Sequence, residues 1–381
     1  MTQKNKVIVV GGDHHNTLGV VESLGQKGVR SFVILHTPHV YGYVVYSKYV
    51  QAGWCCQSEE DIISTLLANF QDKKNKAVII ATNDIVATIL DNNFESLRDY
   101  FIIPTTTPAG TLHKCMSKEF MSSLAREVGL DVPETWVIHD GIIPQDIIYP
   151  VITKAISSVD GSKDNICICR GELELRDFLK DKSRVSIIQA QRFIEKDFEF
   201  QLLGCSLNSG KTVLIPGRTH IDRPKGLDNT FFLKFDKCEP EFEETINKSV
   251  LFVQKVKYTG LFSIEFLRDK NNGKNYFTEM NFRNDGNAVC VTKAGTNLPY
   301  IFYLSQIGED FHSELHNSTI STVYLNPEVY YFGRMLSGEV SFREWVNNVR
   351  RTNCNTTFFK DDKKPFIMFL WNALRKRITG K

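Results

Sequence analysis

Strand-like and helix-like segments alternate along the first hundred residues, and this alternation constrains the fold more than any other feature of the chain. The strand-like segments are short, apolar and rich in β-branched residues. They cover residues 6–10, 31–36, 77–82 and 100–104. The helix-like segments between them cover residues 16–28, 59–70 and 85–97. This order predicts an α/β domain in which an open parallel sheet is covered by helices.

Two loops follow predicted strands at the edge where such sheets bind ligands. One is Gly11–Gly19, with the sequence GGDHHNTLG, and the other is Thr82–Asp84. The first loop lacks the G-x-G-x-x-G pattern, and the second strand ends at Leu35–His36 without an acidic residue. These features disfavour a dinucleotide site. A tight strand-to-helix turn and a substrate pocket both remain open interpretations.

Composition indicates a soluble globular protein of about two or three domains. The chain has 381 residues, of which 42% are apolar, and its 46 Lys and Arg nearly balance 44 Asp and Glu. The chain therefore has no overall charge excess that would argue for a nucleic-acid partner, although a local basic patch remains open. Nine cysteines without a C-x-x-C pair indicate reduced thiols. We expect a cytoplasmic protein, because neither a signal-peptide layout nor a membrane-spanning apolar run is present.

The pattern changes after Pro104. Residues 112–130 predict one amphipathic helix closed by Gly129. A strand carrying Lys154 follows, then a loop rich in Ser, Gly and Asp, and then a returning strand. Such a loop can cover phosphates with its N–H groups, and Lys154 would supply a positive charge. An ordinary hairpin with a surface lysine is the alternative.

A predicted hairpin at residues 260–283 gathers polar side chains on one face. Glu279, Asn281 and Arg283 alternate along its second strand, and the polar turn Asp269–Lys274 places Glu265 approximately opposite Glu279. Two carboxylates this close repel each other unless a cation binds between them, and the amide oxygen also needs a partner. Mg²⁺ prefers such oxygen ligands. The alternative is a solvated face with a surface ion pair to Arg283.

The segment EMNFR, residues 279–283, resembles the E-x-N-x-R strand of the ATP-grasp superfamily, particularly the synthetase domains of carbamoyl-phosphate synthase large subunits and the D-aspartate ligase-like enzymes. The following VTKAGTNLPYIFY resembles the next helix of those enzymes. Five features match in order across residues 5–305. They are the N-terminal α/β domain, a lysine in the linker helix, the strand and loop with Lys154, the adenine segment and the metal-binding hairpin. The resemblance implies an N-terminal α/β domain at 1–105, ATP-grasp lobes at 106–185 and 186–308 with ATP between them, and a C-terminal extension at 309–381.

The resemblance also implies roles for individual residues. Phosphate contacts are implied for Lys114, Lys154, and the loop with Ser157, Ser158, Gly161 and Ser162. Adenine and ribose contacts are implied for Gln191, Arg192, Phe193, Ile194 and Glu199. The Mg²⁺ ion, or Mn²⁺ in its place, would be held by Glu265, Glu279 and Asn281. Arg283 would lie beside the γ-phosphate. Arg218, His220 and Arg223 are further candidates for phosphate or carboxylate contacts, with a solvated basic loop as the alternative.

Three positions depart from the pattern of many relatives. His113 replaces an acid, Gln191 replaces a glutamate, and the loop at 157–165 has one glycine fewer. None of these changes removes a phosphate or metal ligand.

The function that the resemblance implies is that of an ATP-dependent carboxylate–amine ligase. Its partners would be a small-molecule carboxylate and an amine. A homo-oligomer is also compatible with this function. Complete carbamoyl-phosphate synthesis would need two synthetase halves and a glutaminase. A nucleotide-binding module without turnover, sensory or structural, is the alternative, and the intact set of Lys154, Glu265, Glu279, Asn281 and Arg283 argues against it. The identity of both substrates stays open.

The C-terminal segment 365–381 is apolar from Phe366 to Trp371 and then basic at Arg375, Lys376 and Arg377. We favour a terminal helix packed on the body of the protein, with its cationic end complementing the helix dipole. A peripheral membrane-surface helix is the alternative.

Overall fold

The computed structural model describes residues 5–38, 42–154, 166–181, 187–221, 231–316 and 322–379. The chain forms two compact units, each assembled from separate parts of the sequence. The larger unit comprises Met1–Ser117, Glu199–Glu265 and Met280–Lys381. The smaller unit comprises Lys118–Phe198 and Phe266–Glu279. The predicted domain boundaries stay a prediction, because these units group residues by contact rather than by sequence order.

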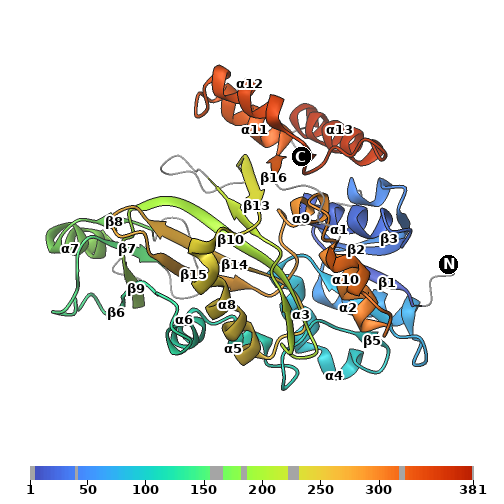
Figure 1. Ribbon diagram of the computed structural model, residues 1–381, viewed down its shortest axis with the longest axis horizontal. Coiled ribbons are helices and arrows are strands. Elements are labelled where there is room, and N and C mark those ends of the chain that lie inside the picture. Colours follow the sequence, from blue (N-terminus) through green and yellow to red (C-terminus); the bar gives the residue numbers. More distant parts are fainter. Residues whose placement is uncertain are drawn as a thin grey trace. The chain divides into compact units, whose positions relative to one another are not determined.

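The N-terminal part of the larger unit is a five-stranded parallel sheet with the order β3-β2-β1-β4-β5. Its strands are β1 (Val7–Gly11), β2 (Ser31–His36), β3 (Val50–Cys56), β4 (Ala77–Ala81) and β5 (Phe101–Ile102). Both β1 and β4 are buried along their whole length, because helices cover both faces of a parallel sheet. The predicted open parallel sheet is confirmed, and Figure 1 shows its strands beside the helices of this region.

The helices that connect these strands are α1 (His15–Gly25), α2 (Glu59–Phe70), α3 (Asp84–Asn92) and α4 (Phe94–Leu97), with a single 3-10 turn, η1 (Val44–Tyr46). The single helix predicted for residues 85–97 was wrong. Asn93 ends α3, because its side-chain amide donates to the carbonyl oxygen of Ile89 at 2.9 Å and competes with the backbone ladder. Strand β3 was not predicted, because Gln51 and Gly53 interrupt its apolar pattern.

A second, mostly antiparallel sheet follows the order β15-β14-β10-β12-β13-β16-β17, and β11 pairs with β10. Its central strands are β10 (Lys196–Leu207), β11 (Thr212–Leu214), β12 (Arg218–His220) and β13 (Leu233–Asp236). The predicted hairpin is confirmed as β14 (Gly260–Asp269) and β15 (Asn275–Asn281). Its turn is closed by a hydrogen bond from the Asp269 N–H to the Lys274 carbonyl oxygen at 2.9 Å. The turn end of this hairpin belongs to the smaller unit.

The smaller unit contains a four-stranded antiparallel sheet with the order β6-β9-β7-β8. Its strands are β6 (Thr135–His139), β7 (Val151–Lys154), β8 (Ile168–Cys169) and β9 (Ile187–Arg192). Ile138, Val151, Cys169, Leu175 and Ala190 form its core, and α7 (Glu172–Asp181) contributes Leu175.

The helix predicted for residues 112–130 is divided into α5 (Leu112–Cys115) and α6 (Lys118–Glu127), so this prediction was wrong. Asp91 accepts the N–H of Leu112 at 2.8 Å and anchors the single turn of α5. Ser117, a residue type favoured before helix starts, then separates the two helices.

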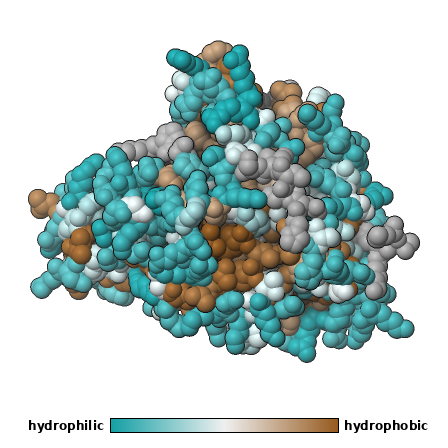
Figure 2. Space-filling view, viewed as in Figure 1, coloured by the Kyte–Doolittle hydropathy of each residue, from teal (hydrophilic) through white to brown (hydrophobic). Residues whose placement is uncertain are grey.

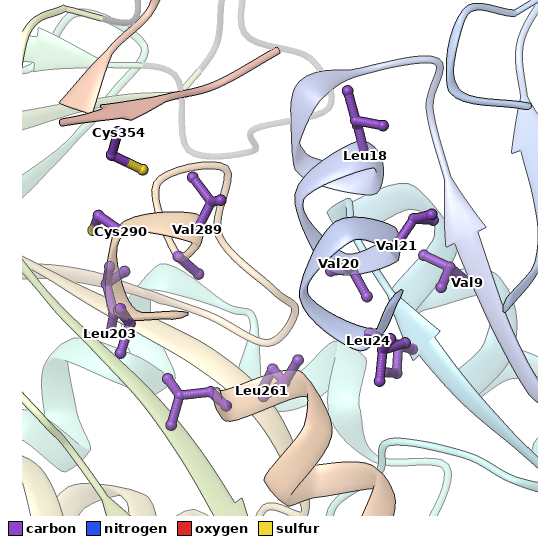
Figure 3. Packing of buried hydrophobic residues seen from close by; sticks show 14 of the residues in the cluster. Val9, Leu18, Val20, Val21, Leu24, Leu203, Leu261, Val289, Cys290 and Cys354 are labelled. Carbon is purple, nitrogen blue, oxygen red and sulfur yellow. The ribbon is translucent and has the colours of Figure 1, made fainter. Parts of the chain in front are cut away.

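The core of the larger unit joins segments that are far apart in the sequence. Helix α1 and strand β1 supply Val9, Leu18, Val20 and Val21, and α9 (Val289–Lys293) supplies Val289 and Cys290 (Figure 3). Leu203 of β10, Leu261 of β14 and Cys354 belong to the same cluster. Burial of these side chains fixes the loop before α9 against the N-terminal sheet domain.

The larger unit contains further elements, of which β16 and β17 complete the second sheet. They are η3 (Pro240–Phe242), α8 (Glu243–Val256), α10 (Leu298–Gln306), η4 (His312–His316), β16 (Thr322–Asn326), α11 (Glu328–Leu336), α12 (Phe342–Arg351), β17 (Cys354–Asn355) and α13 (Lys364–Thr379). Helices α11, α12 and α13 form the group at the top of Figure 1. No helix among the described residues is both long and apolar enough to cross a membrane.

Candidate active site

Strands β14 and β15 bring Glu265 and Asn281 together as the sequence predicted. The side-chain amide of Asn281 donates to Glu265 Oε1 at 3.2 Å and to Ser263 Oγ at 3.2 Å. Gln201 Nε2 donates to the same oxygen of Glu265 at 3.0 Å. An ionised carboxylate only accepts hydrogen bonds, so these contacts fix which end of the Asn281 amide faces Glu265. Asn281 Oδ1 has no hydrogen-bond partner among the described residues and is available as a ligand.

This donor set fits a hard divalent cation. Glu279 is half-buried and lies on the same strand as Asn281, and its side chain forms no hydrogen bond or ion pair with the described residues. Among those residues, no group of three or more His, Cys, Asp or Glu side chains has the arrangement of a metal site. A metal here would therefore rely on carboxylate and amide oxygens, as Mg²⁺ does when substrate oxygens complete its shell. Glu279 belongs to the smaller unit, and its membership of the metal set stays a prediction.

Arg283 follows β15 and is held by two carboxylates. Its Nη1 donates to Asp285 Oδ2 at 3.1 Å, and its Nε lies 3.4 Å from Asp84 Oδ1. The Arg283 side chain is 17% exposed. Burial lowers the pKa of Arg283, but the carboxylates of Asp285 and Asp84 outweigh it, so the pKa is raised. Nη2 has no protein partner among the described residues and can donate to a ligand oxygen.

Asp285 connects Arg283 to the strands that carry the acidic residues. Its Oδ2 accepts a hydrogen bond from Ser263 Oγ at 3.2 Å, and its Oδ1 accepts the N–H of Asn287 at 2.8 Å. Asn287 Nδ2 in turn donates to Gln201 Oε1 at 2.9 Å. Because every link carries a defined hydrogen bond, the network restrains the rotamers of Glu265, Asn281 and Arg283.

Asn16 and Asn284 attach this loop to the N-terminal sheet domain. Asn16 Nδ2 donates to the carbonyl oxygens of Thr82 and Asn284, each at 2.6 Å. Asn284 Nδ2 returns a hydrogen bond to Asn16 Oδ1 at 2.6 Å. Gly286 permits the close approach, because a Cβ at this position would lie 2.7 Å from His15 Nε2. The two loops predicted at the sheet edge, Gly11–Gly19 and Thr82–Asp84, therefore lie beside the Arg283 loop.

His14 is a further polar group at this edge. It is the N-cap of α1, and its Nδ1 accepts the N–H of Asn16 at 3.3 Å. Burial lowers the pKa of His14, the Arg283 guanidinium lowers it further, and Asp285 partly offsets both effects. The neutral ring, with Nδ1 as the acceptor, carries its proton on Nε2. The His14 ring can therefore donate a hydrogen bond from an exposed side chain.

Sequence reasoning missed several members of this network: Asn16, Asp84, Gln201, Asp285 and Asn287. Asp84 and Asp285 had a local signal, since each stands in a polar loop directly after an apolar strand. The pairing of Asp84 with Arg283 joins positions 199 residues apart in the sequence, and no local pattern encodes such a contact. Gln201 lies within a buried strand, where a single amide has no distinguishing spacing.

The proposed adenine segment lies in the smaller unit, at the end of β9. The N–H of Arg192 donates to the Glu134 carbonyl oxygen at 2.8 Å, and the N–H of Phe193 donates to the Pro150 carbonyl oxygen at 2.8 Å. The Gln191 side chain donates to Thr135 Oγ1 at 3.2 Å. The N–H of Ile194 has no partner among the described residues. It is therefore available to a ligand.

The other predicted site residues lie on separate elements. Lys154 ends β7, Lys114 is exposed on α5, and Glu199 is half-buried near the start of β10. The phosphate loop, with Ser157, Ser158, Gly161 and Ser162, lies outside the described residues, as does Arg223. Their roles stay predictions.

Arg218 and His220 both lie on β12. Arg218 is buried, with Nη2 2.6 Å from Glu239 Oε2 and its guanidinium 4.1 Å from the centre of the Phe242 ring. His220 is partly exposed. The predicted contacts of both residues with phosphate or a substrate carboxylate stay predictions.

No protein-family model matches the chain. A curated relative, the D-aspartate ligase of Enterococcus faecium (strain Aus0004), is 22% identical over 294 residues, which is 66% of this chain and 65% of the relative. The chain thus spans about two thirds of the length of that relative. The resemblance predicted from the sequence is confirmed by this homologue and by the structural likenesses below.

Solved structures share the fold over most of the chain. The L-amino acid ligase of Bacillus licheniformis has a TM-score of 0.62 and 16% identity, covering 85% of this chain and 80% of its own. The biotin carboxylase domain of the Hydrogenobacter thermophilus 2-oxoglutarate carboxylase, solved with MgADP, ADP and bicarbonate, has a TM-score of 0.63 and 17% identity, covering 81% and 71%. The predicted fold class, an open parallel domain followed by an ATP-grasp arrangement, is confirmed.

Proposed function

We propose that this chain is an ATP-dependent carboxylate–amine ligase, which activates a carboxylate as an acyl phosphate and transfers it to an amine. The hydrogen-bonded cluster of Glu265, Asn281, Arg283 and Asp285 carries this proposal. It restrains Glu265, Asn281 and Arg283 while leaving an amide oxygen and a guanidinium nitrogen without protein partners among the described residues. The fold shared with the amino-acid ligases supports the same reaction class.

Glu265, Glu279 and Asn281 would hold Mg²⁺ or Mn²⁺, and the structural relative solved with MgADP supports the use of ATP and this metal. The bound metal would neutralise phosphate charge. The ammonium groups of Lys114 and Lys154 would contact phosphate oxygens, and the segment with Ser157, Ser158, Gly161 and Ser162 would cover them. The adenine and ribose would contact residues 191–194 and Glu199, with the Ile194 N–H as one donor.

The reaction has two steps. An oxygen of the substrate carboxylate attacks the γ-phosphorus of ATP, the bond from that phosphorus to the bridging oxygen breaks, and ADP leaves. The amine nitrogen then attacks the acyl carbon, phosphate leaves with one original carboxylate oxygen, and the nitrogen loses a proton. Arg283 would stabilise the charge on the transferring phosphoryl group, as positioned cations do in phosphoryl transfer. No protein nucleophile is required.

The substrates would lie at the carboxyl edge of the N-terminal sheet, where ligands bind in open α/β folds. His14 would donate its Nε2–H to a substrate oxygen there, beside Arg283. Amino acids are the first substrates to test, because the names of both ligase relatives specify them. A cytoplasmic location is part of this proposal, supported by nine free cysteines and the need for ATP.

A screen for ADP formation tests the proposal. The protein would be incubated with ATP, Mg²⁺ and single acids from a panel of amino acids, dicarboxylates, uronic acids and bicarbonate, with hydroxylamine as a small nucleophile. The expected result is ADP together with a hydroxamate for at least one organic acid. Lys154→Ala should abolish both signals, whereas Lys180→Ala, which removes an exposed lysine paired with Asp177, should retain them.

A nucleotide-binding module without turnover predicts a different result. ATP would bind tightly, but no acid, with or without an amine, would yield ADP above background. That outcome would replace the ligase assignment with the sensory or structural alternative.

A further inference from the structure

Helix α13 has apolar side chains on two opposite faces, and the larger unit covers one of them. The Phe369 ring packs 5.1 Å from Tyr43 and 6.3 Å from Tyr330, measured between ring centres. The Phe366 ring lies 5.4 Å from Phe358. This face accounts for the packed terminal helix that the sequence predicted.

The other face consists of Ile367, Leu370, Trp371 and Leu374, which we call the outer stripe. Their spacing of three, four and seven residues places them on one side of the helix. They are 59%, 38%, 60% and 55% exposed, respectively. Figure 2 shows apolar atoms among hydrophilic ones at the top of the view, over the group of α11, α12 and α13. Four large adjacent apolar side chains exposed to water favour a surface that is covered in use.

Charge indicates what covers the outer stripe. Residues 363–381 contain six Lys and Arg and no Asp or Glu. Residues 322–381 contain eleven Lys and Arg against five Asp and Glu, whereas the whole chain has a formal net charge of +2. The positive charge is therefore concentrated in the part of the chain that also exposes the outer stripe. Its partner should be anionic and should accept apolar side chains.

A bilayer surface with anionic phospholipids has both properties. An amphipathic helix with basic residues and exposed Trp and Leu binds in the plane of such a surface, with Trp at the boundary between headgroups and acyl chains. A second copy of this chain would bring two cationic segments together, and a nucleic acid would not need the apolar stripe. We propose that the outer stripe of α13 binds the surface of anionic phospholipid bilayers.

This binding is peripheral. Helix α13 has 16 residues, and one of its faces is already packed against Tyr43. A single short stripe buries limited apolar area, so electrostatic attraction must contribute much of the affinity, and added salt should weaken it. The proposal is independent of the ligase reaction.

Co-sedimentation of the full-length protein with vesicles tests the proposal. One vesicle set contains phosphatidylcholine alone, and the other contains about one third phosphatidylglycerol, which supplies the anionic surface. The double variant Trp371→Gln/Leu374→Gln removes half of the outer stripe, and Arg375→Gln removes one cation. Leu173→Gln is the matched control, because Leu173 is 79% exposed but lies on α7.

The wild type should bind the anionic vesicles, and about 0.5 M salt should release it by screening the charges. The double variant should lose binding by about tenfold or more, and Arg375→Gln by roughly fivefold, while Leu173→Gln binds like the wild type. Circular dichroism melting should be unchanged in all variants, since the replaced side chains are exposed. The proposal is overturned if the folded wild type ignores anionic vesicles, or if the double variant binds them equally well. Sedimentation velocity provides a further test. If the wild type forms a dimer, the double variant does not, and neither binds vesicles, the outer stripe contacts a second copy of the chain and the proposal is overturned.

Discussion

At the scale of single residues, our proposal assigns the chemistry to Arg283 and the acidic residues of the hairpin. Arg283 is held at Nε by Asp84 and at Nη1 by Asp285, and Asn281 is held through its amide nitrogen. These contacts leave Nη2 of Arg283 and Oδ1 of Asn281 without partners among the described residues. A site with restrained side chains loses little conformational freedom when a ligand binds.

Glu279→Gln should preserve the fold but reduce Mg²⁺-dependent turnover by about a hundredfold or more, because one formal charge leaves the proposed metal set with little change in shape. ADP release at increasing Mg²⁺ concentrations measures this effect. Glu244→Gln, which changes an exposed glutamate paired with Lys248, should retain wild-type activity. Wild-type turnover by Glu279→Gln at millimolar Mg²⁺ would remove Glu279 from the metal set.

Arg283→Lys should also be nearly inactive. A lysine has one compact ammonium group and cannot pair with Asp84 and Asp285 while it also presents a planar donor to phosphate. We expect a decrease in kcat of about a hundredfold, by analogy with the loss of other charge-stabilising donors. Steady-state kinetics measure this decrease, with Arg176→Lys on the exposed face of α7 as the control. A kcat close to that of the wild type would show that Arg283 serves the fold rather than the reaction.

At the scale of elements, α1 and the loop after β15 form one polar joint. Asn16, the second residue of α1, makes three hydrogen bonds of 2.6 Å to Thr82 and Asn284. Both asparagines are almost fully buried, so water cannot replace a lost partner. The joint therefore sets the position of the Arg283 loop.

Asn16→Ala should lower the free energy of unfolding by about 2–4 kcal/mol, because it leaves the buried Asn284 amide and two carbonyl oxygens with fewer partners. Urea denaturation followed by circular dichroism measures the change. Asn69→Ala, which removes one exposed side-chain hydrogen bond to Thr65, is the control and should cost well under 1 kcal/mol. An equally small effect at Asn16 would contradict the importance of the joint.

The elements that could be predicted from sequence carry their own local pattern. The hairpin β14–β15 was predicted because polar residues alternate with core residues such as Phe262 and Ile264 on either side of a polar turn. Strand β3 was missed because its apolar pattern is interrupted, and β11, β12 and β13 were missed because they are only three or four residues long. The Asp84–Arg283 pair was missed for a different reason, since tertiary packing alone brings these residues together.

At the scale of the whole molecule, a buried carboxyl pair connects the N-terminal sheet domain to the C-terminal segment. Ser47 Oγ donates to Asp362 Oδ2 at 2.5 Å and lies 3.1 Å from Glu22 Oε1. Glu22 and Asp362 are 2% and 4% exposed. Burial, followed by the neighbouring Asp362, raises the pKa of Glu22 to about 9. The protonated form of Glu22 is therefore the form compatible with the fold at neutral pH.

Stability should decrease as pH rises from about 4.5 to about 9. The unfolded chain releases the Glu22 proton near its usual pKa of 4.5, whereas the folded chain retains it until about pH 9, so rising pH favours unfolding. The slope is at most about 1.4 kcal/mol per pH unit for one proton. Glu22→Gln should flatten the dependence of Tm on pH in this range, and Glu60→Gln, at an exposed position of α2, should not. Parallel curves for the wild type and Glu22→Gln would contradict a protonated Glu22.

The central claim is that this chain activates a carboxylate as an acyl phosphate, and an oxygen-transfer measurement tests it most directly. An acid that supports ADP formation would be labelled with ¹⁸O in its carboxylate and converted to the amide with ATP, Mg²⁺ and an amine. Because phosphate leaves with one carboxylate oxygen, mass spectrometry should find one ¹⁸O in the inorganic phosphate and unlabelled ADP. Amide formation with unlabelled phosphate, or with the label in AMP, would contradict the account.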